Sequence, residues 1–216
     1  MGLEPSRVQA MAREVKSLAA LKLQVAIVLG GGNILRGRDA DGAKMDRVTA
    51  DSIGMLGTLI NSLALQSALE REGVATRVQM ALEIQKLAEP YVRRRALRHM
   101  EKGRVVIFAG GTGHPFFSTD TAAALKALEI GADALIKATK VDGVYDKDPA
   151  KHKNARRFDT LSYSEVLRRK LEIMDLTAIS LCMDQKMPIV VCSLEPAGNL
   201  NRLVKGARLG TWVGGE

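Results

Sequence analysis

The sequence predicts an α/β fold in which a mostly parallel sheet carries helices on both faces, as a three-layer sandwich. Three apolar runs rich in β-branched residues, VAIVL, RVVIFA and PIVVCSL, are typical of strands buried on both faces. Helical patterns separate these runs, and such alternation favours parallel strands joined by helical crossovers. The 216 residues, 46% of them hydrophobic, suffice for a single domain over residues 1–216.

The elements follow in order along the chain. Pro5 suits a first helical turn, and apolar residues from Val8 to Leu18 recur at helical spacing. A second helix is opened by Asp51, and a basic helix starts near Pro90. The predicted helices span 5–21, 51–71, 89–102, 119–130 and 162–186, with a short one after Gly198. The predicted strands span 25–29, 76–81, 104–109, 134–139, 188–194 and the closing TWV. Residues 140–160 are polar and predict a hairpin and a long surface loop.

Composition narrows the class of protein. The net charge of +8 is compatible with an anionic partner, but the basic residues are scattered through helical patterns and favour solvated faces over a nucleic-acid surface. Aromatic residues make up only 4%, which leaves little for base stacking. Cys182 and Cys192 lie in apolar surroundings, as buried thiols of a reducing compartment do. With no run of eighteen apolar residues and no secretory pattern, we expect a cytoplasmic protein without a membrane span.

The loop after the first strand, VLGGGNILRG at 28–37, predicts a phosphate site. Three consecutive glycines let the backbone approach a ligand with its N–H groups outward. Arg36 adds a planar cation suited to phosphate. A tight turn is the alternative, although one glycine usually suffices for that. Neither GxxxxGK[ST] nor GxGxxG is present, which argues against a P-loop ATPase and a Rossmann dehydrogenase.

The loop in FAGGTGHPFFSTDTAA, from residue 108, predicts a second anion site. Gly110, Gly111 and Gly113 free the backbone, and Ser118 or Thr119 can cap the helix that follows. At least one ring of Phe116-Phe117 is expected to pack under the loop. His114 is more consistent with a surface polar residue than with an acid or base. Two phosphate-binding loops on neighbouring strands suggest a reaction between two phosphate-bearing ligands.

The third loop, KATKVDGVYDKDP at 137–149, suits a nucleoside, because Tyr145 offers a ring for a base and Asp148 offers an acid. A simple Asp-Gly turn remains possible from this segment alone.

Six stretches carry a family pattern: GGGNILRG, MDRVTADSIGMLGTLINSLALQ, AGGTGHPFFSTDTAA, KATKVDGVYDKDPAK, LSYSEVL and MDLTAISLCMD. In their order and approximate spacing, the chain resembles the bacterial and archaeal uridylate kinases of the amino-acid kinase superfamily. They extend over nearly the whole chain.

The resemblance implies transfer of the γ-phosphoryl group of ATP, with Mg²⁺, to UMP. Arg36 would stabilise charge, and Asp175 would organise active-site lysines. No residue is implied as a dedicated metal ligand. The positions implied for UMP are Gly31, Asp51, Thr112, Gly113, His114, Pro115, Phe116, Phe117, Ser118 and Thr119. Those implied for ATP are Gly32, Arg36, Thr139, Tyr145 and Asp148. The resemblance also implies a homohexamer with GTP and UTP as effectors.

The chain departs from this family at two places. The usual first strand ending in Lys-Leu-Ser-Gly-Glu has no counterpart before Gly30, so a central strand and a phosphate-binding lysine are expected to be lacking. Unpaired ladder edges should result. A start that lies upstream, a clipped chain or a truncated paralogue would each explain this. In addition, His114 stands where asparagine is common.

Two rivals follow. Another enzyme of the superfamily, such as an acetylglutamate or aspartate kinase, would not need the PFF-ST loop as a nucleoside clamp. A non-catalytic nucleotide-binding or regulatory subunit would fit the lacking lysine.

Overall fold

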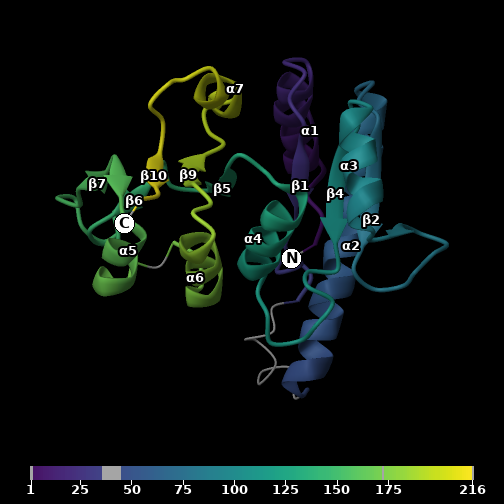
Figure 1. Ribbon diagram of the computed structural model, residues 1–216, viewed down its shortest axis with the longest axis horizontal. Coiled ribbons are helices and arrows are strands. Elements are labelled where there is room, and N and C mark those ends of the chain that lie inside the picture. The colour runs from purple at the N-terminus through teal and green to yellow at the C-terminus, as the bar shows by residue number, and fades with distance from the viewer. Residues whose placement is uncertain (1, 36–44, 172, 216) are drawn as a thin grey trace. The chain divides into compact units, whose positions relative to one another are not determined.

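The computed structural model describes residues 2–35, 45–171 and 173–215. The chain divides into two compact units, Met1–Ala123 and Ala124–Glu216, each with a sheet and a hydrophobic core of its own (Figure 1). That the whole chain behaves as one domain stays a prediction. The α/β class with mostly parallel strands is confirmed in both units.

The first unit holds a parallel sheet with the strand order β1-β4-β2-β3. Its elements are α1 (Pro5–Ala19), β1 (Ala26–Val28), α2 (Arg47–Arg71), β2 (Thr76–Met80), β3 (Glu89–Pro90), α3 (Arg93–Glu101), β4 (Val105–Ala109) and the first turn of α4 (Thr119–Ile130). All five residues of β4 are buried, as expected for a strand covered on both faces. One core cluster joins Val105 and Ile107 of β4 to Leu65 and Leu69 of α2.

The α2 helix begins earlier than predicted. It starts at Arg47 because the side chain of Asp46 accepts a hydrogen bond from the Thr49 backbone N–H at 2.9 Å, which caps the helix. Asp51 therefore lies in the second turn and does not open the helix. By length and composition α2 could cross a membrane, but core helices of soluble proteins pass the same test. Its side chains Leu59, Leu65 and Leu69 belong to the core of this unit.

The basic helix also differs at its start. Glu89 and Pro90 pair in parallel with Gln79 and Met80 as the short strand β3, and α3 begins only at Arg93. Proline has no N–H to donate, which suits the edge of a sheet.

The second unit holds the strand order β5-β9-β10-β8, in which β10 runs antiparallel to β9 and the other pairs are parallel. Its elements are β5 (Leu135–Thr139), β6 (Val144–Tyr145), β7 (Arg157–Phe158), β8 (Thr160–Leu161), α5 (Tyr163–Arg169), α6 (Leu176–Asp184), β9 (Ile189–Ser193), α7 (Asn199–Val204) and β10 (Thr211–Val213). The hairpin predicted within 140–160 is confirmed as the antiparallel pair of β6 and β7.

The predicted helical stretch 162–186 contains two helices. Ser162 caps α5, which ends where Lys170 adopts a left-handed conformation with φ 52°, and Asp175 caps α6. Cys182 and Cys192 are buried, as predicted. Burial raises the pKa of the Cys182 thiol to about 11.

Each four-stranded sheet ends in a strand with one paired edge. Among the described residues β1 pairs only with β4, and β5 pairs only with β9. Every open sheet ends in strands of this kind, so the lack of a central strand stays a prediction.

Candidate functional site

The loop after β1 lies directly against α2. A Cβ atom on Gly31 would come within 2.1 Å of the Gly54 carbonyl oxygen, so only glycine fits there. The Gly31 carbonyl accepts hydrogen bonds from the N–H groups of Ile34 and Leu35, which turns the chain tightly. The sequence pattern predicted that the backbone of this loop lies close to a ligand. The structure shows that at Gly31 the backbone lies close to helix α2.

The loop after β4 is shaped by glycines in the left-handed region. Gly110, Gly111 and Gly113 have φ values of 82°, 58° and 82°, which other residues rarely adopt. The Gly110 N–H donates to the Thr58 hydroxyl at 2.7 Å, which ties this loop to α2. The Thr112 hydroxyl accepts from the His114 N–H at 3.2 Å, so it is engaged within its own loop.

Ser118 caps α4, because its Oγ accepts from the Thr121 N–H at 3.1 Å. The helix starts at Thr119, as predicted. The N-terminus of a helix carries a partial positive charge, which favours an anion at this point.

Asp51 connects α2 to the loop that carries the two phenylalanines. Its Oδ2 accepts from the Phe116 N–H at 2.8 Å, and both carboxylate oxygens lie within 2.9 Å of Arg47 Nε. The Arg47 guanidinium carbon lies 5.9 Å from the centre of the Phe116 ring, within cation–π range. Phe116 has φ 70°, an uncommon conformation for a bulky residue.

These segments line an open cavity of about 210 Å³, which we call the glycine-loop cavity. It is lined by Gly31, Gly32, Leu35, Arg47, Asp51, Gly54, Met55, Thr58, Gly111, Thr112, His114, Phe117, Ser118 and Thr119. Its chemistry combines glycine backbone, hydroxyl groups, a carboxylate and a guanidinium. Such a lining can hold a phosphate beside a polyol.

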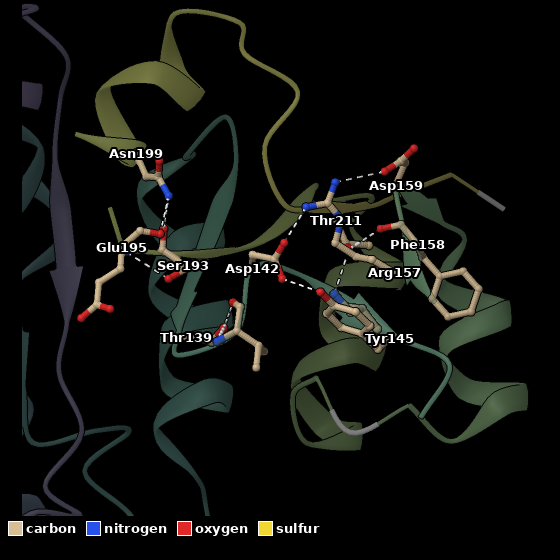
Figure 2. Close-up of polar contacts among 12 residues, drawn as sticks. Thr139, Asp142, Tyr145, Arg157, Phe158, Asp159, Ser193, Glu195, Asn199 and Thr211 are labelled. Carbon is tan, nitrogen blue, oxygen red and sulfur yellow. Dashed lines mark hydrogen bonds and ion pairs between the residues drawn. The ribbon is translucent and has the colours of Figure 1, made fainter. Parts of the chain in front are cut away.

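In the second unit, polar contacts organise the segment after β5 (Figure 2). The Thr139 hydroxyl donates to the Val141 carbonyl at 2.6 Å, and Asp142 accepts from the Tyr145 hydroxyl at 2.6 Å. This hydrogen bond is the main cause of a lowered pKa for Asp142 and a raised pKa for Tyr145. Asp148 accepts from the Ala150 N–H at 2.9 Å and shapes the next turn.

The sequence model of the amino acid kinase family matches residues 1–193 of this chain. The chain belongs to the amino acid kinase family. Among solved structures of this family, a UMP kinase from Bacillus anthracis is similar, with a TM-score of 0.95 and 38% identity over 99% of this chain and 88% of that one. A UMP kinase from Ureaplasma parvum has a TM-score of 0.92 and 34% identity, covering 99% of this chain and 91% of that one. A uridylate kinase from Archaeoglobus fulgidus has a TM-score of 0.76 and 30% identity, covering 97% of this chain and 93% of that one.

Seven of the ten positions predicted to bind UMP line the glycine-loop cavity. They are Gly31, Asp51, Thr112, His114, Phe117, Ser118 and Thr119. Gly113, Pro115 and Phe116 are not in the lining. Residues Phe116 and Phe117 are 67% and 51% exposed, so the prediction that one of their rings packs under the loop is wrong. The hydrogen bond from the Phe116 N–H to Asp51, rather than a buried ring, anchors this loop.

The positions predicted for ATP and catalysis are distributed differently. Gly32 lines the glycine-loop cavity, whereas Thr139, Tyr145 and Asp148 belong to the second unit. Asp175 caps α6 by accepting from the Ala178 N–H at 2.9 Å, and its role toward lysines stays a prediction. Arg36 lies outside the described residues.

Sequence reasoning missed five lining residues. Four of them belong to the same helix as Asp51. Arg47 stands four residues before Asp51, and Gly54, Met55 and Thr58 stand three, four and seven residues after it. That is the spacing of one helix face, so reading the helical neighbours of Asp51 would have found them. The fifth, Leu35, follows the tight turn after Gly31 and carries no such signal.

Proposed function

We propose that this chain is a nucleoside monophosphate kinase that transfers the γ-phosphoryl group of ATP to UMP, giving UDP and ADP. The observation that carries this proposal is the glycine-loop cavity, which gathers hydroxyl groups, glycine N–H groups and a carboxylate around one helix N-terminus. The UMP kinases named above, at 38% and 34% identity over 99% of the chain, support the same substrate.

In this proposal the first unit holds UMP. The N-terminus of α4, with Ser118 and Thr119, binds the UMP phosphate, because the helix dipole favours an anion there. Asp51 accepts a hydrogen bond from a ribose hydroxyl. The second unit holds ATP through the segment from Thr139 to Asp148. In the reaction, a UMP phosphate oxygen bonds to the γ-phosphorus as the bond to the ADP leaving oxygen breaks. This chemistry requires in-line positioning and charge stabilisation rather than a covalent nucleophile, and Arg36 supplies a cation.

In this proposal Mg²⁺ binds together with ATP. Among the described residues no three His, Cys, Asp or Glu side chains are arranged to hold a metal ion. Mg²⁺ usually binds nucleotide phosphates with only one or two protein carboxylates, so an ion that arrives with ATP needs no three-ligand cluster of its own. Bound there, it would neutralise charge on the phosphates.

A homo-oligomer, with a hexamer as the expected form, belongs to the same proposal. Val48, Leu56 and Ile60 of α2 are 46%, 43% and 44% exposed, and Leu56 and Ile60 stand four residues apart, as neighbours on a helix face do. Clustered exposed apolar side chains favour a protein contact. Light scattering coupled to size exclusion measures the mass directly.

GTP and UTP as effectors, and a cytoplasmic location, complete the proposal. The two described free thiols, both buried, suit a reducing compartment. Titrating GTP and UTP into the assay tests the effectors.

The deciding experiment presents Mg-ATP with UMP, CMP, N-acetylglutamate or aspartate and measures both product formation and acceptor binding. Formation of UDP, with CMP and the amino acids poor acceptors, is the expected result. UMP binding without turnover would favour the non-catalytic alternative. Transfer to an amino acid without UMP binding would refute the proposal.

A further inference from the structure

Asp142 in the second unit accepts two side-chain hydrogen bonds from different elements. The Tyr145 hydroxyl donates at 2.6 Å, and Arg157 Nη1 donates at 2.8 Å (Figure 2). A second nitrogen of Arg157 reaches Asp159 at 3.4 Å, although the Asp159 side chain is 88% exposed. The guanidinium thus spans the hairpin and fixes the acid that holds the tyrosine.

Strand register brings these side chains together. In the antiparallel pair of β6 and β7, Tyr145 stands opposite Arg157. Directly paired residues on neighbouring strands place their side chains on the same face, within contact distance.

The turn before Tyr145 is closely packed against two side chains. A Cβ on Gly143 would lie 2.7 Å from Thr211 Oγ1 and 2.8 Å from Arg157 Cδ. The Val144 N–H donates to Thr211 Oγ1 at 2.8 Å, so β10 holds the turn from one side while Arg157 holds it from the other.

We propose that Arg157 is a positioning residue for the nucleotide site, which it serves by holding Asp142 and, through it, the ring of Tyr145. This inference rests on the proposed function, in which Tyr145 contacts the base of ATP. Because the Tyr145 hydroxyl is engaged by Asp142, the residue offers the base a ring face and not a hydrogen-bond donor. Base binding at Tyr145 therefore depends on stacking, which does not distinguish one purine from another.

The charges of this network persist at neutral pH. The hydrogen bond from Tyr145, helped by Arg157, lowers the pKa of Asp142, and the same bond raises the pKa of Tyr145. The carboxylate stays ionised and the phenol stays protonated, so each keeps the role that the contacts require.

The chain offers a matched control one residue away. Arg156 is exposed, and its backbone N–H bonds to Asp146, but its guanidinium makes no ion pair with any residue that the structure describes. Arg157→Met and Arg156→Met therefore remove the same charge from adjacent positions, and only the first breaks the contact with Asp142.

The experiment measures ATP and UMP dissociation constants of the full chain by calorimetry, with unfolding temperatures recorded alongside. Arg157→Met should weaken ATP binding about fivefold, in line with a partly exposed ion pair, and leave UMP binding unchanged. Arg157→Lys, which keeps the charge, should recover part of the loss. Arg156→Met should match the wild type.

A double-mutant cycle separates positioning from general structural damage. Tyr145→Phe keeps the ring but loses its bond to Asp142, so it should weaken ATP binding in the wild type and change it little in Arg157→Met.

Several outcomes overturn the inference. One is equal ATP binding by Arg157→Met and Arg156→Met, and another is fully additive losses in the cycle. A parallel loss of ATP binding, UMP binding and thermal stability would show that Arg157 only maintains the fold. If the wild-type chain binds UMP but not ATP, the inference fails together with the ATP site. If it binds neither nucleotide, the proposed function fails as well.

Discussion

Asp51 Oδ2 accepts the backbone N–H of Phe116 at 2.8 Å, across 65 positions of sequence. This bond holds a residue whose φ of 70° costs on the order of 1–3 kcal/mol for a side chain of this kind. Helix α2 therefore sets the path of the loop that borders the glycine-loop cavity. The same carboxylate contacts Arg47, so the anchor of the loop is also part of the cavity wall.

Replacing Asp51 by alanine should release this loop. Because a hydrogen bond to a charged group contributes about 1.5–3 kcal/mol, we expect UMP affinity to fall at least tenfold. Calorimetry measures the affinity, and hydrogen exchange at the Phe116 amide should become faster. Asp159→Ala is the control, since that side chain is 88% exposed. Unchanged UMP affinity in Asp51→Ala would contradict this role.

Arg47→Met tests the cation of the cavity. Arg47 pairs with Asp51 at 2.8 Å and lies over the Phe116 ring, so its loss removes one charge and one support of the loop. UMP should bind roughly fivefold to tenfold more weakly, as expected when a partly exposed charged contact is removed. Arg98→Met removes a comparable surface ion pair, to Glu101, and should have no effect on UMP. Equal affinities for the two variants would exclude Arg47 from the site.

The sequence predicted the elements better than their ends. Buried strands such as β4 are apolar throughout and bounded by glycine or polar residues, so their positions follow from local pattern alone. The start of α2 does not, because Asp46 and Asp51 are both good caps and only the hydrogen bond to Thr49 decides between them. Glu89 and Pro90 join a sheet through pairing with β2, which no local pattern reveals.

For the candidate site, the sequence motifs predicted which loops line the cavity but not which hydrogen bonds fix the conformation of those loops. The glycines of both loops were visible in the sequence, whereas the hydrogen bond from Gly110 to Thr58 joins positions 52 residues apart. At least one ring of the pair Phe116 and Phe117 was expected to pack under the loop. Here the Asp51 carboxylate anchors the loop through its backbone, which leaves both rings exposed.

The Tyr163 hydroxyl should make stability depend on alkaline pH. It is buried and donates to the Met187 carbonyl. Burial raises the pKa of Tyr163 to about 12, from an ordinary value of 10.0. A group whose folded pKa is raised stabilises the fold fully below its unfolded pKa and loses that contribution as pH rises through the folded one. Unfolding free energy should therefore decline between about pH 10 and pH 12, and less steeply in Tyr163→Phe. Parallel curves for the two proteins in urea titrations would disprove this assignment.

Gly31→Ala should separate folding from ligand binding at the first loop. An added Cβ would meet the Gly54 carbonyl oxygen at 2.1 Å, and because that atom is backbone it cannot move aside cheaply. We expect a loss of about 1–3 kcal/mol in unfolding free energy, the usual range for overpacking, together with weaker UMP binding. Gly214→Ala is the matched control, since Gly214 has open space around a new Cβ and no positive φ. Urea unfolding and UMP calorimetry on both variants measure the effect. A Gly31→Ala protein as stable as Gly214→Ala would show that the loop can leave α2, and the cavity geometry would then need another support.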